Sequence, residues 1–198
     1  MISLFRNLGF RWKLTLPILV LAALFVALGF SAISAVNNVE SRLIRVSQEL
    51  LPQSSTILEA DRDLYQALQA ERALLAGVDF PGLADDQTGN MQQASDRIAK
   101  YGAATVSPEG KALAADFARA FDVWKRTSLE NVRMAAAGNA EQARQTSFNR
   151  GYEEFSKARG LIDQMTELVN AEAAQESIEA EEDANASHAR VAMVLGVG

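Results

Sequence analysis

The apolar and polar residues divide the chain into apolar ends and a long region of helical repeats between them. No charged residue occurs from Leu14 to Val39, and most of this run is apolar enough and long enough to cross a bilayer as a helix. After Arg190 the chain reads VAMVLGVG, which is again apolar or small. At ~1.5 Å per residue this segment cannot span a membrane, so we interpret it as the start of a second span.

Between these ends the sequence predicts four helices. Ala, Glu, Gln, Arg and Leu dominate the region, and no stretch alternates with the two-residue period of a strand. Glycine and proline are confined to a few points, which place the helices at about 37–76, 85–101, 108–137 and 140–190, with a kink at Pro52 and an N-cap at Ser107. Short connections make sequential helices antiparallel neighbours. The predicted fold class is therefore all-α, an antiparallel up-down-up-down four-helix bundle preceded by a transmembrane helix and followed by the start of a second.

Each predicted helix carries an apolar stripe at helical spacing, and these stripes should form the core of the bundle. The second helix has the weakest stripe. The stripe residues are Leu43, Val46, Leu50, Ile57, Ala60, Leu64, Ala67, Leu68 and Leu75 on helix one, Met91, Ala94, Ile98 and Tyr101 on helix two, Leu113, Phe117, Phe121 and Trp124 on helix three, and Phe148, Phe155, Ile162, Met165 and Val169 on helix four.

Helix one carries a second apolar stripe outside the predicted core. Ile44, Leu51, Leu58 and Tyr65 recur every seven residues, which is typical of a seam between two helices. We therefore predict a homodimer in which helix one of each copy packs against the other. Isolated apolar residues on a protein surface are common, and they are the alternative interpretation.

Beyond Leu58, the same face of helix one becomes rich in hydrogen-bond donors. Arginine can hold a carboxylate or phosphate with two parallel hydrogen bonds and stays charged at physiological pH, so these residues are candidates to bind a small anion. Alternatively, Arg62 and Arg72 are solvated or pair with acids such as Asp61, Asp63 and Glu71. The candidate ligand-binding residues of helix one are Arg62, Tyr65, Gln66, Gln69 and Arg72.

Helix four offers a matching patch. Gln69 lies 32 residues above Asn37, and Ala158 lies 32 residues before Arg190, so the two positions should stand at similar height above the membrane. The two patches should then face one another in the membrane-distal half of the bundle. The candidate residues of helix four are Arg150, Tyr152, Ser156 and Arg159.

Several acidic residues occupy unusual positions. Asp61 and Glu71 fall on the core stripe of helix one, where an unpaired carboxylate would be unfavourable. They should pair with a basic residue such as Arg119, Arg133, Arg150 or Arg159, or lie where the bundle opens around a cavity. Between Arg159 and Arg190 there are also eight acidic residues and no basic one. We interpret this run as a solvated face that partly complements Arg42 and Arg45, because one continuous helix is a poor cage for a divalent cation.

The distribution of charge predicts the orientation in the membrane. Arg6, Arg11 and Lys13 precede the first span without any acidic residue, which places the N-terminus in the cytoplasm. A cleaved signal peptide is the alternative interpretation of the first span, since Ala32-Ile33-Ser34 resembles a cleavage site. The predicted segments are a cytoplasmic N-terminus at 1–13, a transmembrane helix at 14–36, a periplasmic four-helix bundle at 37–190, and the start of a second transmembrane helix at 191–198.

Composition narrows the function classes. All 25 acidic residues but only 16 of the 19 basic residues lie between 37 and 190, so this region has a net charge of −9, which disfavours nucleic acid and anionic lipid as partners. The chain has no cysteine and a single histidine, His188. We find no motif for a metal, a cofactor, a phosphate loop or a nucleophile, so we predict neither an enzyme nor a metal or cofactor site.

This layout resembles the ligand-binding region of bacterial methyl-accepting chemotaxis proteins, and the sequence DLYQALQAERALL at residues 63–75 is similar to the distal part of helix one in such receptors. Membrane-bound histidine kinases and diguanylate cyclases use similar outer domains. The resemblance implies a dimeric inner-membrane receptor that binds ligand between the two copies of helix one and the top of helix four. In the aspartate-type receptors, arginines of helix one spaced five and then four residues apart hold the ligand. Arg62 can occupy the first place here, but Ala67 and Glu71 occupy the others.

The sequence thus predicts a chemoreceptor sensory module whose periplasmic bundle binds an amino acid, an organic acid or an inorganic anion. A displacement of helix four would carry the signal across the membrane to cytoplasmic partners. The input domain of a histidine kinase or a diguanylate cyclase is the alternative function, and a structural bundle without a small ligand is a third. The sequence does not identify the ligand.

Overall fold

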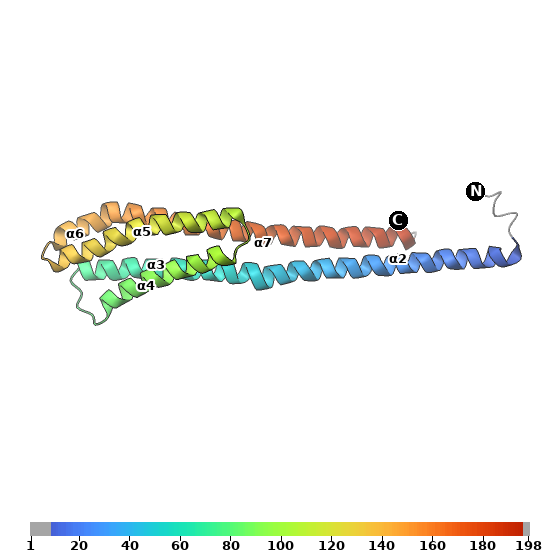
Figure 1. Cartoon of the computed structure of the whole chain (residues 1–198), viewed down its shortest axis with the longest axis horizontal. Helices are drawn as coiled ribbons and strands as arrows, with labels where there is room; N and C mark the ends of the chain where they lie inside the picture. The colour runs from blue at the N-terminus through green and yellow to red at the C-terminus, as the bar shows by residue number, and fades with distance from the viewer. Residues whose placement is uncertain (1–8, 196–198) are drawn as a thin grey trace. The chain divides into compact units, whose positions relative to one another are not determined.

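The computed structural model describes residues 9–195, and these are almost entirely helical, with no strand (Figure 1). Arg6 and the last three residues of the predicted second span lie outside the described residues. The described chain forms two compact units, one made of residues 46–173 and one that joins residues up to 45 with those from 174 onward. The elements are α2 (Phe10–Arg45), the π-helix η1 (Val46–Leu50), α3 (Leu51–Leu75), α4 (Leu83–Ala104), α5 (Pro108–Ala136), α6 (Ala140–Thr146), the π-helix η2 (Ser147–Gly151) and α7 (Tyr152–Leu195).

Residues 46–173 form the predicted four-helix bundle, in which α3, α4, α5 and the α6–α7 segment lie side by side (Figure 1). Two of the helices end where glycine was expected to stop them. Gly77 and Gly138 have φ angles of 77° and 93°, and each lies in a turn that returns two backbone N–H groups to the last carbonyls of the helix. The chain can therefore reverse sharply after α3 and after α5.

The N-terminal signals of the sequence are also present. The Ser107 hydroxyl accepts a hydrogen bond from the Gly110 N–H at 3.3 Å, and Pro108 occupies the first position of α5. The kink predicted at Pro52 stays a prediction, and the π-helix η1 lies just before this proline. Proline has no N–H to donate to the carbonyl four residues earlier, so the regular hydrogen-bond pattern cannot continue through this point.

The core of the bundle agrees with the predicted stripes except at two residues. Phe117, Trp124 and Phe155 are at most 1% exposed, and the stripes of α3 and α4 converge on them. The prediction was wrong for Leu43, which is 65% exposed because it belongs to the other unit and not to the bundle. It was also wrong for Phe148, which is 58% exposed. Phe148 lies in η2, where the wider π-helical turn breaks the seven-residue register with Phe155.

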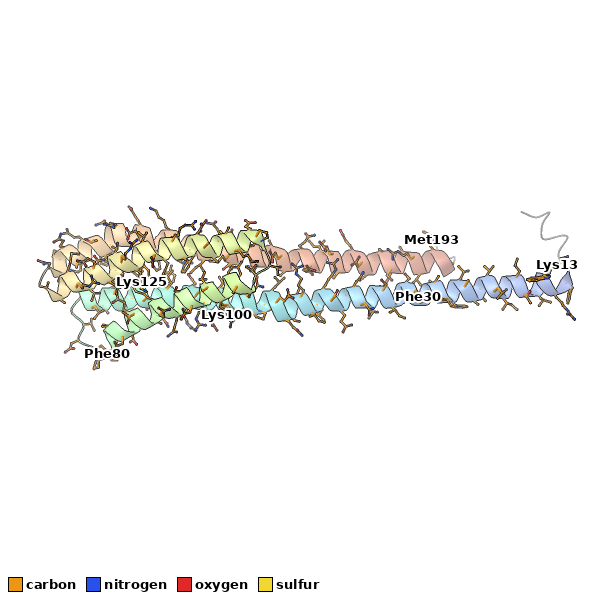
Figure 2. All side chains as sticks on the ribbon, in the orientation of Figure 1. Lys13, Phe30, Phe80, Lys100, Lys125 and Met193 are labelled. Carbon is orange, nitrogen blue, oxygen red and sulfur yellow. The ribbon has the colours of Figure 1, made fainter. Side chains whose placement is uncertain are left out.

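The second unit contains α2 and the C-terminal part of α7. Among the described residues, one helix is long and apolar enough to cross a membrane by length and composition, and it begins at Phe10. Its large apolar side chains are exposed along α2, and Phe30 is one of them (Figure 2). As predicted, the acidic run of α7 complements Arg42 and Arg45. Arg42 pairs with Glu176, Glu179 and Asp183, and Arg45 pairs with Glu176 at 2.9 Å.

Candidate ligand-binding site

The structure brings part of the helix-one patch against part of the helix-four patch. The guanidinium carbon of Arg72, on α3, lies 5.6 Å from the ring centre of Tyr152 on α7 and 4.7 Å from that of Phe148 in η2. Arg159, on α7, lies 5.2 Å from the ring centre of Tyr65 on α3. All three distances are within the range of a cation–π interaction. The two patches therefore meet through arginine–aromatic contacts on one side of the bundle.

The buried Phe155 ring packs against both tyrosine rings of these contacts. The Phe155 ring is 5.2 Å from that of Tyr65 in an edge-to-face arrangement and 6.2 Å from that of Tyr152 in a stacked one. Phe155 also packs edge-to-face on Trp124, at 5.5 Å. Aromatic pairs with these separations stabilise each other beyond the area they bury. The rings of Tyr65 and Tyr152 are thus held on a rigid aromatic base.

Arg159 is neutralised by two carboxylates. Its Nε lies 3.2 Å from Asp61, and its Nη1 donates a hydrogen bond to Asp163 at 3.0 Å. The prediction that Asp61 pairs with a basic residue of another helix is therefore confirmed. Burial raises the pKa of the Asp61 carboxyl, and the nearby Arg159 guanidinium partly opposes this rise.

Arg150 and Arg62 are paired as well. Arg150 is exposed and donates to Glu154, one turn away on the same helix, at 2.7 Å. Arg62 donates two hydrogen bonds to Asp63, which is fully buried and also receives one from Arg97 of α4 at 2.6 Å. The alternative interpretation of Arg62, a pair with a neighbouring acid, is the one found in the structure. Arg97 was not singled out in the sequence.

Glu71 departs from the prediction. It is buried, but no arginine within residues 9–195 forms a salt bridge with it. Its carboxylate accepts hydrogen bonds from the Ser128 hydroxyl at 2.6 Å and from the Asn131 amide at 3.0 Å, both on α5, and Gln87 of α4 donates to Ser128 at 2.9 Å. The expectation of a basic partner was wrong because two neutral donors of α5 satisfy the carboxylate, and Gln87 of α4 donates to one of them. This layer of Glu71, Gln87, Ser128 and Asn131 is called the polar layer below.

Arg72 is the exception among the candidate arginines. Within residues 9–195 it has no hydrogen bond or ion pair to a carboxylate, and its Nε is buried without a hydrogen-bond partner. Burying part of a guanidinium group without a counter-charge costs free energy. Arg72 is therefore a positive charge that two aromatic rings hold in place and that no acid of the described chain neutralises.

Gln66 and Gln69 lie apart from this arginine–aromatic cluster. They line a cleft of about 540 Å³ between α3 and the first turns of α4. Asp86 and Asn90, which the sequence did not indicate, line the α4 side of the cleft, and Ala70 and Ala73 lie on its α3 side. The remaining predicted residue, Ser156, is exposed on α7. The predicted patches are thus divided between two places on the bundle.

No group of three or more histidine, cysteine, aspartate or glutamate residues in the described part of the chain could hold a metal ion. A family model described as a four helix bundle sensory module for signal transduction matches residues 7–184. No curated protein and no solved structure matches the chain at the threshold applied. The family match agrees with the observed fold, and it describes a sensory module, not a catalytic one.

Proposed function

Because this chain belongs to the four-helix-bundle sensory modules of methyl-accepting chemotaxis proteins, we propose that it is the sensory part of a chemoreceptor that binds a small anionic or polar solute. The bundle would lie in the periplasm and α2 would anchor it in the inner membrane. Three basic residues before the apolar run support this orientation, because cytoplasmic flanks carry an excess of lysine and arginine.

The lack of a carboxylate partner for Arg72 within residues 9–195 is the observation that supports an anionic ligand. Each of the other candidate arginines already contacts a carboxylate, whereas Arg72 contacts only aromatic rings. Ring contacts fix the plane of the guanidinium and leave its terminal Nη groups available to an external acceptor. A bound carboxylate or phosphate would supply the missing counter-charge through charge-assisted hydrogen bonds.

A second copy of the chain would complete the site. Ile44, Leu51, Leu58 and Tyr65 are all exposed, as a stripe that packs against a second copy of the chain would be. Tyr65 belongs both to this stripe and to the arginine–aromatic cluster. A partner packed along the stripe would therefore cover the ligand-binding surface beside Tyr65 and exclude water from it.

Signal transmission would follow from differential binding. The ligand-binding residue Tyr152 is the first residue of α7, and the same helix continues to Leu195. A ligand that contacts α7 differently in two positions of this helix would shift the population between them. Such a shift would alter the pairing of the α7 acids with Arg42.

Thermal unfolding of the full chain in lipid nanodiscs tests the proposal. A ligand that binds only the folded state raises the melting temperature by mass action, so acetate, succinate, phosphate, nitrate, benzoate and several amino acids would be compared at millimolar concentration. We expect at least one anion to raise the melting temperature and Arg72→Ala to weaken its binding by about ten- to hundredfold. Arg126→Ala is the control, because Arg126 is exposed on α5 and donates only to a backbone carbonyl. Equal affinity in the Arg72 and Arg126 variants would refute the site.

A further inference from the structure

Three exposed aromatic rings belong to the arginine–aromatic cluster, and two of them, Phe148 and Tyr152, lie against Arg72. Phe148 is 58% exposed, Tyr152 is 48% exposed and Tyr65 is 38% exposed, although four other aromatic residues of α5 and α7 are buried in the core. Exposed aromatic residues gathered in one place mark an interaction site more often than isolated ones do. We call Phe148, Tyr152, Tyr65 and Arg72 the aromatic face.

The backbone turns Phe148 toward this face. In a regular α-helix, Phe148 and Phe155 would share one side, and both would enter the core. The π-helix η2 changes the register, so Ser147 and Gly151 are buried and Phe148 points outward. Single-turn π-helices are rare and occur often at functional sites. The exposure of Phe148 is therefore built into the backbone.

The aromatic face combines two chemical features in one place. The Phe148 and Tyr152 rings lie 4.7 and 5.6 Å from the Arg72 guanidinium carbon, so a molecule bound to the guanidinium edge would also lie near both rings. Arg72 offers paired N–H donors to a planar carboxylate, and the rings offer flat π surfaces to a flat ligand. An aliphatic acid or an inorganic anion would use only the first feature.

We propose that the ligand of this site is a planar aromatic carboxylate of the benzoate class, with Arg72 holding the carboxylate, the exposed Phe148 stacking on the ring and the edge of Tyr152 beside it. This inference rests on the proposed function and specifies its ligand. Arg72 is the point of the site where such an anion would find an unneutralised positive charge, because the other candidate arginines are already paired with acids.

Calorimetric titration of the full chain in lipid nanodiscs tests the ligand class. The probes are benzoate, cyclohexanecarboxylate, benzamide, acetate and phosphate. Cyclohexanecarboxylate keeps the charge and the approximate size of benzoate without a π system, and benzamide keeps the ring without the charge. We expect benzoate to bind about tenfold more tightly than cyclohexanecarboxylate, since each ring contact contributes only a few-fold, and we expect no measurable binding of benzamide.

Matched variants separate the ring contact from general apolar packing. Phe148→Leu keeps an apolar side chain of similar size and should weaken benzoate binding about three- to tenfold while leaving any acetate binding unchanged. Phe80→Leu makes the same chemical change at an exposed phenylalanine between α3 and α4 and should leave benzoate affinity unchanged.

Three results would overturn the inference. If acetate or phosphate binds through Arg72 and benzoate does not, the aromatic class is wrong and the proposed sensory function survives. If no anion binds at any accessible concentration, the proposed anion site fails together with the aromatic class. If Phe148→Leu changes the molar mass measured by light scattering in detergent and leaves benzoate affinity unchanged, the aromatic face is a contact between copies of the chain.

Discussion

Removing one hydroxyl from the polar layer should cause a large loss of stability. Ser128 is fully buried, donates to the Glu71 carboxylate at 2.6 Å and accepts from Gln87 at 2.9 Å. Ser128→Ala keeps the shape of the side chain but leaves the carboxylate with one donor fewer. A hydrogen bond to a charged group contributes about 1.5–3 kcal/mol and a neutral one about 0.5–1.5 kcal/mol, so we expect the free energy of unfolding to fall by about 2–4 kcal/mol.

Another buried serine of the same bundle provides the control. Ser147 is 1% exposed and its hydroxyl has no hydrogen-bond partner within the described chain. Ser147→Ala removes a buried hydroxyl that makes no hydrogen bond within the described chain. It should therefore lower the free energy of unfolding by less than about 0.5 kcal/mol, or raise it slightly. The two variants make the same chemical change in the same core and differ only in their hydrogen bonds.

Urea titration followed by the emission of the buried Trp124 measures both variants. Trp12→Phe in all samples removes the other tryptophan, which lies at the start of α2. Repeating Ser128→Ala in a Glu71→Leu background isolates the charged hydrogen bond, and we expect the effect of the serine change to shrink by about 1.5 kcal/mol or more. Equal losses for Ser128→Ala and Ser147→Ala, or no coupling between Ser128 and Glu71, would refute the role given to the polar layer.

Three further predictions concern local packing, pH and the unit formed by α2 and α7. Gly110→Ala should lower the free energy of unfolding by about 1–3 kcal/mol, since a Cβ there would lie 2.6 Å from the buried Tyr101 hydroxyl. Gly160→Ala should raise it by about 0.5–1 kcal/mol, because nothing lies within 4 Å of the added Cβ. Urea titration of both variants checks that the two changes have opposite signs. Burial raises the pKa of Asp61, so ionisation of this carboxyl lowers stability as pH rises above its unfolded value of about 3.9. The melting temperature of Asp61→Asn relative to the native chain should then be higher at pH 7 than at pH 3.5, and a pH-independent difference would contradict this. Arg42→Ala should broaden the distance distribution between spin labels on α2 and α7, because this arginine pairs with three acids of α7. An unchanged distribution would show that these ion pairs do not hold the two helices together.

Most of the fold could be predicted from the sequence. Helix ends depend on local signals, and Gly77, Ser107 and Gly138 each supply one through a positive φ angle or a side-chain cap. The core depends on a period of 3.6 residues, which holds wherever the helix is regular. The prediction of the core from this period failed at Phe148, because the pattern of apolar residues does not indicate where a helical turn is π-helical and therefore wider.

The site was harder to predict because its contacts cross between helices. The sequence located Arg72 and Tyr152 in two patches of similar height, since distance along a helix is easily counted. It did not show that Glu71 has neutral partners or that Asp63 is buried between two arginines, because both facts depend on which faces of α3, α4 and α5 meet. Nor did it show that Gln66 and Gln69 face α4 instead of α7.

The π-helix η2 explains why one turn of backbone affects both the surface and the interior. An added Cβ at Gly151 would lie 3.3 Å from the Thr146 carbonyl oxygen, which is a tight contact within the turn, and 3.6 Å from the Asn131 amide of the polar layer, which is an ordinary one, so glycine relieves crowding in η2. The same turn directs Phe148 outward, over Arg72. A change that relaxed η2 to a regular helix would rotate Phe148 toward the core and remove one ring from the aromatic face. The glycine that relieves crowding within this turn therefore also favours the backbone that presents Phe148 to the proposed ligand.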